Sequence, residues 1–246
     1  MSMPPIVGLG CRRYRDGAFS EIVDEVAVET GIEVTCGPGP VSRLYAAPFD
    51  LETLALGHAC LEMCPPGFRP IPLAGDDLTE AGRRDDHRRF AFDMIAKDTA
   101  RPGPKRHVFL APGNVVESMR RFIAAPGLWN DTGCFHRACA LDPVTGDFSF
   151  RAEDIGRHNC LDRLRGLAMR AEQDLDGLIL FLSARVTASM CEKALRAGFT
   201  CIVSRSAVTT EAVRLAQEGG ISLAGFAREA ENRFTVFCDP QARFAT

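Results

Sequence analysis

The spacing of hydrophobic residues is most regular in the C-terminal half of the chain. Apolar runs at residues 178–182, 199–203 and 221–226 are separated by segments with helical periodicity. Apolar strands that alternate with helices are typical of parallel pairing through right-handed crossovers, in a sheet covered on both faces. We therefore expect residues 111–246 to form an α/β domain with a parallel or mixed sheet and helices on both faces.

Further elements are predicted ahead of these runs. A helix over 159–173 has apolar residues at helical spacing, and strands are expected at 135–141 and 148–151. Another helix is expected to begin at Asn114, because Glu117 follows three residues later as in a capping box.

Residues 1–110 are expected to form a smaller β-containing domain with a flexible tail and a polar linker. β-Branched residues alternate with acidic ones over 22–34, the Cys36–Pro40 segment breaks the run, and a second short strand follows at 41–47. This pattern predicts a hairpin.

Two segments complete the N-terminal part. Asp50 is expected to cap a helix that ends before Pro65. The stretch 67–104 is polar and is expected to be irregular, with the mixed-charge run 83–89 as a solvated helix face.

Composition limits the classes of function. A net charge of -3 and a pI of about 6.0 argue against a protein that neutralises nucleic-acid phosphates. No signal-like or membrane-spanning apolar run is present, so we expect a cytoplasmic protein without a membrane partner. The 10 cysteines are scattered, which favours reduced thiols over a disulfide framework.

Polar residues follow two of the predicted strands at matching places. Ser183 and Arg185 follow the first strand, whereas Ser204, Arg205 and Ser206 follow the second, each just before a helix. Helix N-termini, hydroxyls and guanidinium groups together favour an anion such as phosphate. The alternative is that the hydroxyl groups only cap the two helices.

A second polar cluster spans Glu153–Asn159 and contains Arg157 and His158. It is a candidate site, although Asp154 pairing with Arg157 and Asn159 capping the helix would explain it structurally. No CxxC or HxxxH pair is present, so no metal site and no zinc are predicted.

These motifs resemble those of the FdhD/NarQ family. The similarity runs from about residue 20 to 238. The matching segments are Asp24–Glu29, Leu54–Gly57, Thr132–His136, Glu153–Asn159 with Asp162, Ser183–Arg185, Glu192–Ala194, Ser204–Thr209 and Gly225–Arg228.

The resemblance implies a cytidine-deaminase-like core without zinc, a small β-containing domain and a homodimer. It also implies transfer of sulfur from a cysteine desulfurase to the bis-guanine-dinucleotide form of a molybdenum or tungsten cofactor, which then enters the catalytic subunit of formate dehydrogenase. The residues implied to bind this cofactor are Ser183, Arg185, Ser204, Arg205, Ser206, Phe226, Ala227 and Arg228.

The chain departs from the family at the sulfur-carrying loop. Relatives have CGxCG there, whereas the corresponding Phe109–Asn114 contains no cysteine. Sulfur carriage needs a thiolate. A displaced thiol is one hypothesis, with Cys134 as carrier and His136 and His158 as further catalytic candidates, although a strand cysteine is typically buried packing.

The alternative is a non-catalytic chaperone or scaffold that binds the cofactor and has lost sulfur transfer. A nucleotide hydrolase on the same fold is disfavoured, because the zinc ligands of a deaminase are missing.

Overall fold

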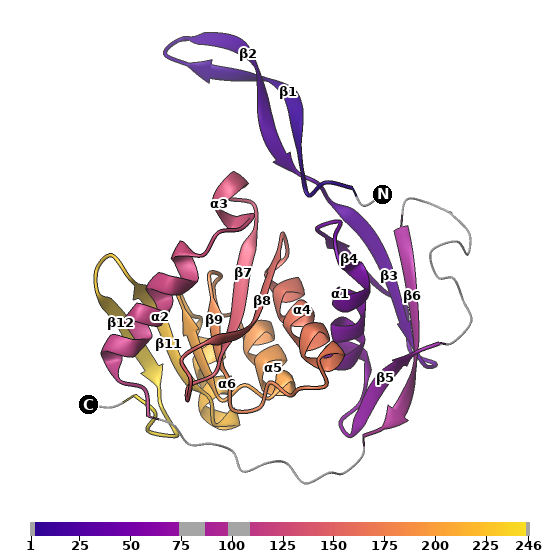
Figure 1. The fold of residues 1–246 in the computed structure, drawn as a ribbon, viewed down its shortest axis with the longest axis vertical. Helices are drawn as coiled ribbons and strands as arrows, with labels where there is room; N and C mark the ends of the chain where they lie inside the picture. Colours follow the sequence, from indigo (N-terminus) through magenta and orange to yellow (C-terminus); the bar gives the residue numbers. More distant parts are fainter. Residues whose placement is uncertain (1–2, 74–86, 98–108, 245–246) are drawn as a thin grey trace.

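The computed structural model describes residues 3–73, 87–97 and 109–244 (Figure 1). These residues form a projecting two-stranded hairpin, a four-stranded sheet and a six-stranded sheet with helices on both faces. The α/β prediction is confirmed. In the described part of the chain, every helix is too short or too polar to cross a membrane.

The hairpin is formed by β1 (Ile6–Arg15) and β2 (Ala18–Ala27). Asp16 and Gly17 join the strands with φ of 52° and 88°. Both residues are left-handed, as the tightest hairpin turns require. This hairpin was not predicted, although the Asp-Gly pair was a sequence signal for it.

The four-stranded sheet has the order β4-β3-β6-β5. β3 (Thr30–Cys36) pairs antiparallel with β4 (Ser42–Ala46), which confirms the predicted hairpin. The single strand expected over 22–34 is instead divided between β2 and β3.

The expectation of irregular structure over 67–104 is wrong where the chain is described. β5 (Phe68–Pro72) pairs antiparallel with β6 (His87–Ala96), which pairs parallel with β3. Arg89 of β6 bonds Glu33 across this sheet, so the end of the 83–89 run is a strand and not a helix face. Residues 83–86 lie outside the described residues. β5 and β6 are stabilised by pairing with distant strands, which local sequence periodicity does not reveal.

The predicted helix after Asp50 is present as α1 (Leu51–His58), continued by a π-helical turn, η1 (Ala59–Met63). Asp50 is the N-cap residue, as predicted, but its side chain makes no capping bond to a helix amide. It has a left-handed φ of 43°, and its carboxylate accepts a bond from the Thr53 hydroxyl at 2.7 Å.

The six-stranded sheet has the order β12-β11-β10-β9-β7-β8. Its central strands β9, β10 and β11 are parallel, as predicted, and the outer pairings are antiparallel. The strands are β7 (His136–Leu141), β8 (Phe148–Asp154), β9 (Ile179–Leu182), β10 (Cys201–Ser204), β11 (Ser222–Arg228) and β12 (Arg233–Cys238).

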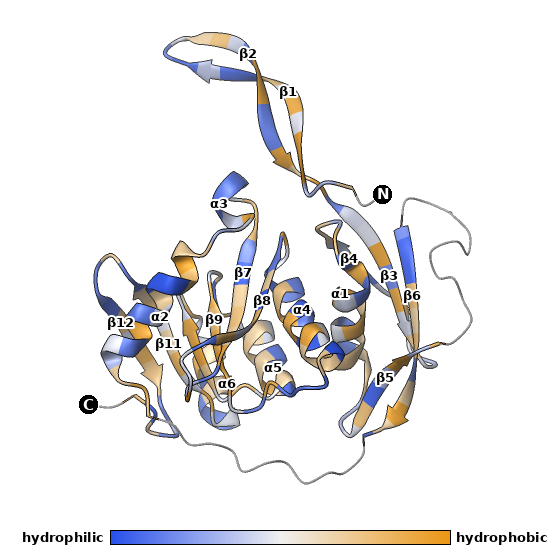
Figure 2. Cartoon of the chain, viewed as in Figure 1, coloured by the Kyte–Doolittle hydropathy of each residue, from blue (hydrophilic) through white to orange (hydrophobic). Residues whose placement is uncertain are grey.

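Helices cover both faces of this sheet. α4 (Arg157–Arg170), α5 (Ala188–Ala197) and α6 (Thr210–Gly219) pack on one face, and α2 (Pro112–Ala124) packs on the other. The strands between these layers are predominantly apolar (Figure 2). α2 begins at Pro112, so Asn114 is not its cap. The short α3 (Trp129–Thr132) was not predicted.

The two large sheets are joined by close packing of α1 on α4. A Cβ at Gly57 would lie 1.8 Å from the Asp162 carbonyl oxygen, and one at Gly166 would lie 1.9 Å from that of Thr53. Only glycine permits this approach. The interface therefore brings the end of α1 directly onto the first turns of α4.

Candidate functional site

The carboxyl ends of β9, β10 and β11 lie side by side, because these strands are parallel neighbours. Ligands collect outside such ends in open α/β sheets. Thr187 and Thr209 are the N-cap residues of the following helices, and the Thr209 hydroxyl accepts a bond from the Ala212 amide. The structure thus brings together the ends of β9 and β10, whose following polar residues stood out as similar in the sequence.

The serine hydroxyls at this edge hold the strand ends together. Ser183 accepts from the Arg137 amide at 2.8 Å. The fully buried Ser204 donates to the Ala184 carbonyl and accepts from the Ser206 amide. Ser204 therefore positions the loop and does not itself reach a ligand.

Three arginines supply positive charge near these ends. Arg185 is exposed. Arg205 lies over the Trp129 ring at 5.9 Å and pairs with Glu229 through two contacts of 3.4 Å. Arg157 was not among the residues predicted to bind the cofactor. Its Nε is buried and has no hydrogen-bond partner among the described residues. An unpaired buried donor is costly, so it marks a position for an acceptor.

His136 begins β7 next to this charge. Burial lowers its pKa, and the nearby Arg157 and Arg185 charges lower the pKa further. The imidazole is therefore neutral near pH 7, and it reports a positive potential at this edge.

Phe226–Arg228, which the family resemblance also implied to bind the cofactor, forms the end of β11. Phe226 has a left-handed φ of 49°, and its amide donates to the Ser206 carbonyl at 2.9 Å. The β11–β12 register shifts here, Ala227 is buried and Arg228 is half-buried. A left-handed aromatic residue is strained, and such strain clusters at binding sites.

Cys134 lies in the loop between α3 and β7 and is exposed. It precedes the strand, so the expectations that it shares a strand face with His136 and is buried packing are wrong. The positive φ of Gly133, 67°, ends α3 and turns the chain outward before β7 begins.

The cysteines buried in the six-stranded sheet and its helices are poor sulfur carriers. Burial raises the pKa of Cys139 and Cys201 to about 12 and that of Cys191 to about 11. Burial also raises the pKa of Cys160. These thiols lack the thiolate character that nucleophilic attack requires.

The Glu153–Asn159 cluster is largely structural. Glu153 pairs with Arg137 at 2.7 Å and accepts from the Leu128 amide. Asp154 pairs with Arg163 at 2.8 Å, not with Arg157 as proposed.

Asn159 is also not a helix cap, because Gly156 holds that position. Its amide donates to Asp154 and to the Tyr45 carbonyl of the other sheet. His158 contacts the Ser189 hydroxyl at 2.9 Å and lines a pocket between the N-terminal sheet and helices α4 and α5. Within residues 3–73, 87–97 and 109–244, no group of three His, Cys, Asp or Glu side chains is arranged for a metal ion.

Comparison with known proteins agrees with the motifs. A model of the FdhD/NarQ family matches residues 81–244, more than half of the chain. The chain belongs to the FdhD/NarQ family. Its relatives include the sulfur carrier protein FdhD of Staphylococcus aureus strains MRSA252 and Newman, each 27% identical and aligned over 93% of both chains.

The fold of this FdhD/NarQ member is also found in a crystal structure. A proposed formate dehydrogenase accessory protein from Desulfotalea psychrophila superposes with a TM-score of 0.77, covering 98% of this chain and 100% of that one. The sequence identity is 21%, so this likeness concerns the fold.

Proposed function

We propose that this FdhD/NarQ protein is an accessory sulfur carrier in formate dehydrogenase maturation. It binds the bis-guanine-dinucleotide form of a molybdenum or tungsten cofactor at the β9–β11 edge. The observation that carries the proposal is the unpaired, buried Arg157 Nε beside the cationic Arg185 and a neutral His136. Phosphate oxygens match this arrangement, because guanidinium groups bind them through charge-assisted hydrogen bonds.

Each strand end contributes to the proposed contacts. The loops after Ser183 and Ser204 present helix N-termini, which favour negative charge. Arg205 and the Phe226–Arg228 segment provide the third side. Ser204 and Ala227 act by shaping the loops, because both are buried.

Calorimetry with GDP tests this site. Arg157→Ala and Arg205→Ala should each weaken binding by about 1.5–3 kcal/mol, because each loses a hydrogen bond to a charged group. Arg214→Ala, on the exposed face of α6, is the matched control and should bind as the wild type does. Unchanged affinity in both site variants would remove the nucleotide from this edge.

Cys134 is the proposed carrier. It is exposed and lies two residues before His136, at the same edge of the sheet. The Cys134 thiolate attacks the outer sulfur of the desulfurase persulfide. This attack forms the Cys134 persulfide, breaks the sulfur–sulfur bond and leaves a thiolate on the desulfurase. The Cys134 persulfide would be the sulfur source for the cofactor held at this edge.

The cofactor chaperone is a second candidate function. It is favoured by the absence of cysteine throughout residues 98–114 and by the buried, high-pKa thiols of the sheet. In that case the β9–β11 edge binds cofactor without sulfur chemistry.

A persulfide assay separates the two candidates. The protein is incubated with a cysteine desulfurase and cysteine, and persulfides are located by mass spectrometry. Cys134→Ala should abolish the persulfide and the rescue of formate dehydrogenase in a host without its accessory protein, whereas Cys11→Ala should retain both. Rescue without any persulfide would establish the chaperone.

The chain would meet a cysteine desulfurase and the formate dehydrogenase catalytic subunit in the cytoplasm, and it would act as a homodimer. The projecting β1–β2 hairpin supports the dimer, since an isolated two-stranded hairpin is marginally stable in water.

A further inference from the structure

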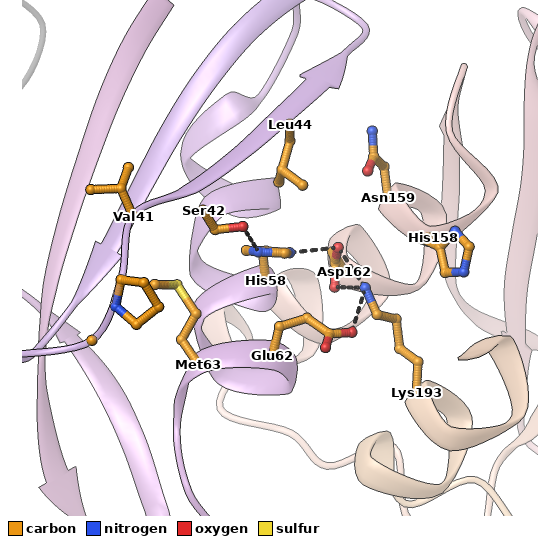
Figure 3. A pocket seen from close by; sticks show the side chains of 12 residues that line it. Val41, Ser42, Leu44, His58, Glu62, Met63, His158, Asn159, Asp162 and Lys193 are labelled. Carbon is orange, nitrogen blue, oxygen red and sulfur yellow. Dashed lines mark hydrogen bonds and ion pairs between the residues drawn. The ribbon is translucent and has the colours of Figure 1, made fainter. Parts of the chain in front are cut away.

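A cavity of about 620 Å³ lies between the N-terminal sheet and helices α4 and α5 (Figure 3). The proposed sulfur-carrier function does not use it. Its wall joins a loop and strand of one sheet, Gly39–Ser42 and Leu44, to polar side chains that include His58, Asp162 and Lys193. The cavity therefore exists only where the two parts of the chain meet.

Three of its side chains form a continuous hydrogen-bonded array. The Ser42 Oγ lies 2.8 Å from His58 Nε2, and His58 Nδ1 lies 3.2 Å from Asp162 Oδ2. Figure 3 shows the imidazole between the hydroxyl and the carboxylate. This is the connectivity of a Ser-His-Asp catalytic triad, which recurs on unrelated folds and is recognised by geometry.

The array fixes the proton positions. Asp162 is ionised: burial opposes this, but the Lys193 charge and the His58 hydrogen bond lower its pKa below the usual value. The carboxylate must accept a proton from His58 Nδ1, since it has none to donate. Nε2 of a neutral His58 is then an acceptor for the Ser42 hydroxyl. This is the tautomer that a general base requires.

Lys193 helps to hold the Asp162 carboxylate in place. Its Nζ lies 2.9 Å from Asp162 Oδ1 and 3.0 Å from a Glu62 oxygen, and Arg196 also pairs with Glu62 at 3.0 Å. The Asp162 carboxylate lies directly against His58 and stabilises the imidazolium formed when His58 takes the serine proton.

The backbone holds the array rigidly. Ser42 begins β4, His58 ends α1, and Asp162 lies in the second turn of α4. The contact of Gly57 with the Asp162 backbone places His58 against its carboxylate. His58 and Asp162 are buried, whereas Ser42 is half-buried and lines the cavity.

We propose that Ser42, His58 and Asp162 form a nucleophilic site for carboxylic esters. The Ser42 Oγ bonds to the ester carbonyl carbon while its proton passes to His58 Nε2. The bond to the alcohol oxygen breaks, and the alcohol leaves with that proton. Water then attacks the acyl-serine, its proton returns through His58 to Ser42, and a carboxylic acid is released.

The cavity also selects the ester. Val41, Leu44 and Met63 give an apolar wall opposite the charged cluster. A neutral ester with a short apolar acyl group fits this wall, whereas a carboxylate on the acyl group would lose its hydrating water there without gaining a partner.

Covalent labelling tests the site directly. A fluorophosphonate probe should modify Ser42 as its phosphorus bonds to Oγ and fluoride leaves. Ser42→Ala should lose the label, whereas Ser20→Ala, at an exposed hairpin serine, should keep it. Absence of Ser42 labelling in folded wild-type protein would overturn the proposal.

Two further measurements exclude a merely structural array. His58→Gln should reduce the labelling rate on the order of 100-fold, the lower range for a lost general base, with the fold monitored by circular dichroism. Wild-type protein should hydrolyse 4-nitrophenyl butyrate faster than anionic 4-nitrophenyl hemisuccinate. A labelling rate unchanged in His58→Gln would contradict the triad; equal hydrolysis of both esters would overturn the proposed selectivity.

Discussion

At the scale of single residues, the hydrogen-bond and ion-pair partners of the Glu153–Asn159 cluster determine what each of its side chains does. Asp154, Arg157 and Asn159 stand within six positions of one another. Asp154 pairs with the buried Arg163, and Asn159 donates a hydrogen bond to the other sheet. Arg157 therefore keeps an Nε without a hydrogen-bond partner among the described residues. Asp154 and Asn159 therefore stabilise the fold, whereas the Arg157 guanidinium is available to bind a ligand.

Removal of Arg163 should be strongly destabilising. Its guanidinium bonds Asp154 and the carbonyls of Ala47, Phe49 and Asp50 across the interface. Arg163→Ala leaves a buried carboxylate unpaired, so the free energy of unfolding should fall by about 3–5 kcal/mol. Urea denaturation measures this change. Arg214→Ala, in an exposed pair, should leave it nearly unchanged.

His136 should titrate below the pKa of about 6.5 typical of histidine. Its pKa is lowered by burial and by two arginines, so its contribution to stability is present above that pH and is lost as pH falls. A bound phosphate should raise this pKa, because it screens the arginines. NMR titration of the His136 ring with and without GDP measures both effects. A pKa unmoved by saturating GDP would place the phosphates elsewhere.

At the scale of elements, the α1–α4 contact depends on two glycines. Helix propensity alone would favour alanine over glycine by about 1 kcal/mol. Sterics reverse this sign at Gly57, where a Cβ would collide with backbone of α4. Glycine at this contact therefore lowers helix propensity, but it allows the close approach of α1 and α4 that aligns the two sheets.

Two substitutions separate these effects. Gly57→Ala should lower the thermal midpoint and disturb the His58–Asp162 contact, because α1 must move away from α4. Gly113→Ala, in α2 with open space around its Cβ, should be neutral or stabilising by up to ~1 kcal/mol. Equal midpoints for the two variants in calorimetric scans would show that the helices tolerate separation.

At the scale of the whole molecule, the hairpin extends away from the body (Figure 1). Tyr14, Phe19 and Val23 lie on one face of the hairpin and are exposed, Val23 by 75%. A monomer rarely leaves such residues grouped in water, so a second copy of the chain is the proposed cover.

Charge on the hairpin should therefore dissociate the proposed dimer. The Phe19→Asp, Val23→Asp double variant should have the mass of a monomer by light scattering, because burying carboxylates in an apolar contact is costly. Val144→Asp, at an exposed turn far along the chain, should leave the mass unchanged. A wild-type protein that is monomeric at tens of micromolar would contradict the homodimer.

The periodic part of the fold was predictable from the chain alone. The parallel β9–β11 core, its helices and the strand-end serines and arginines follow from local pattern, because apolar runs and helix spacing are encoded within a few residues. Family membership was equally readable from contiguous motifs.

Long-range contacts decided the rest. β5 and β6 form by pairing between residues that are distant in the sequence. Asp154 pairs with Arg163 rather than with Arg157, which is nearer in sequence, because Arg163 is buried where the two sheets are joined. Likewise, Ser42, His58 and Asp162 lie far apart in sequence, with no local signal for their contact. Spacing along the chain encodes local backbone geometry, whereas the position of one side chain against another is fixed only when separate elements pack.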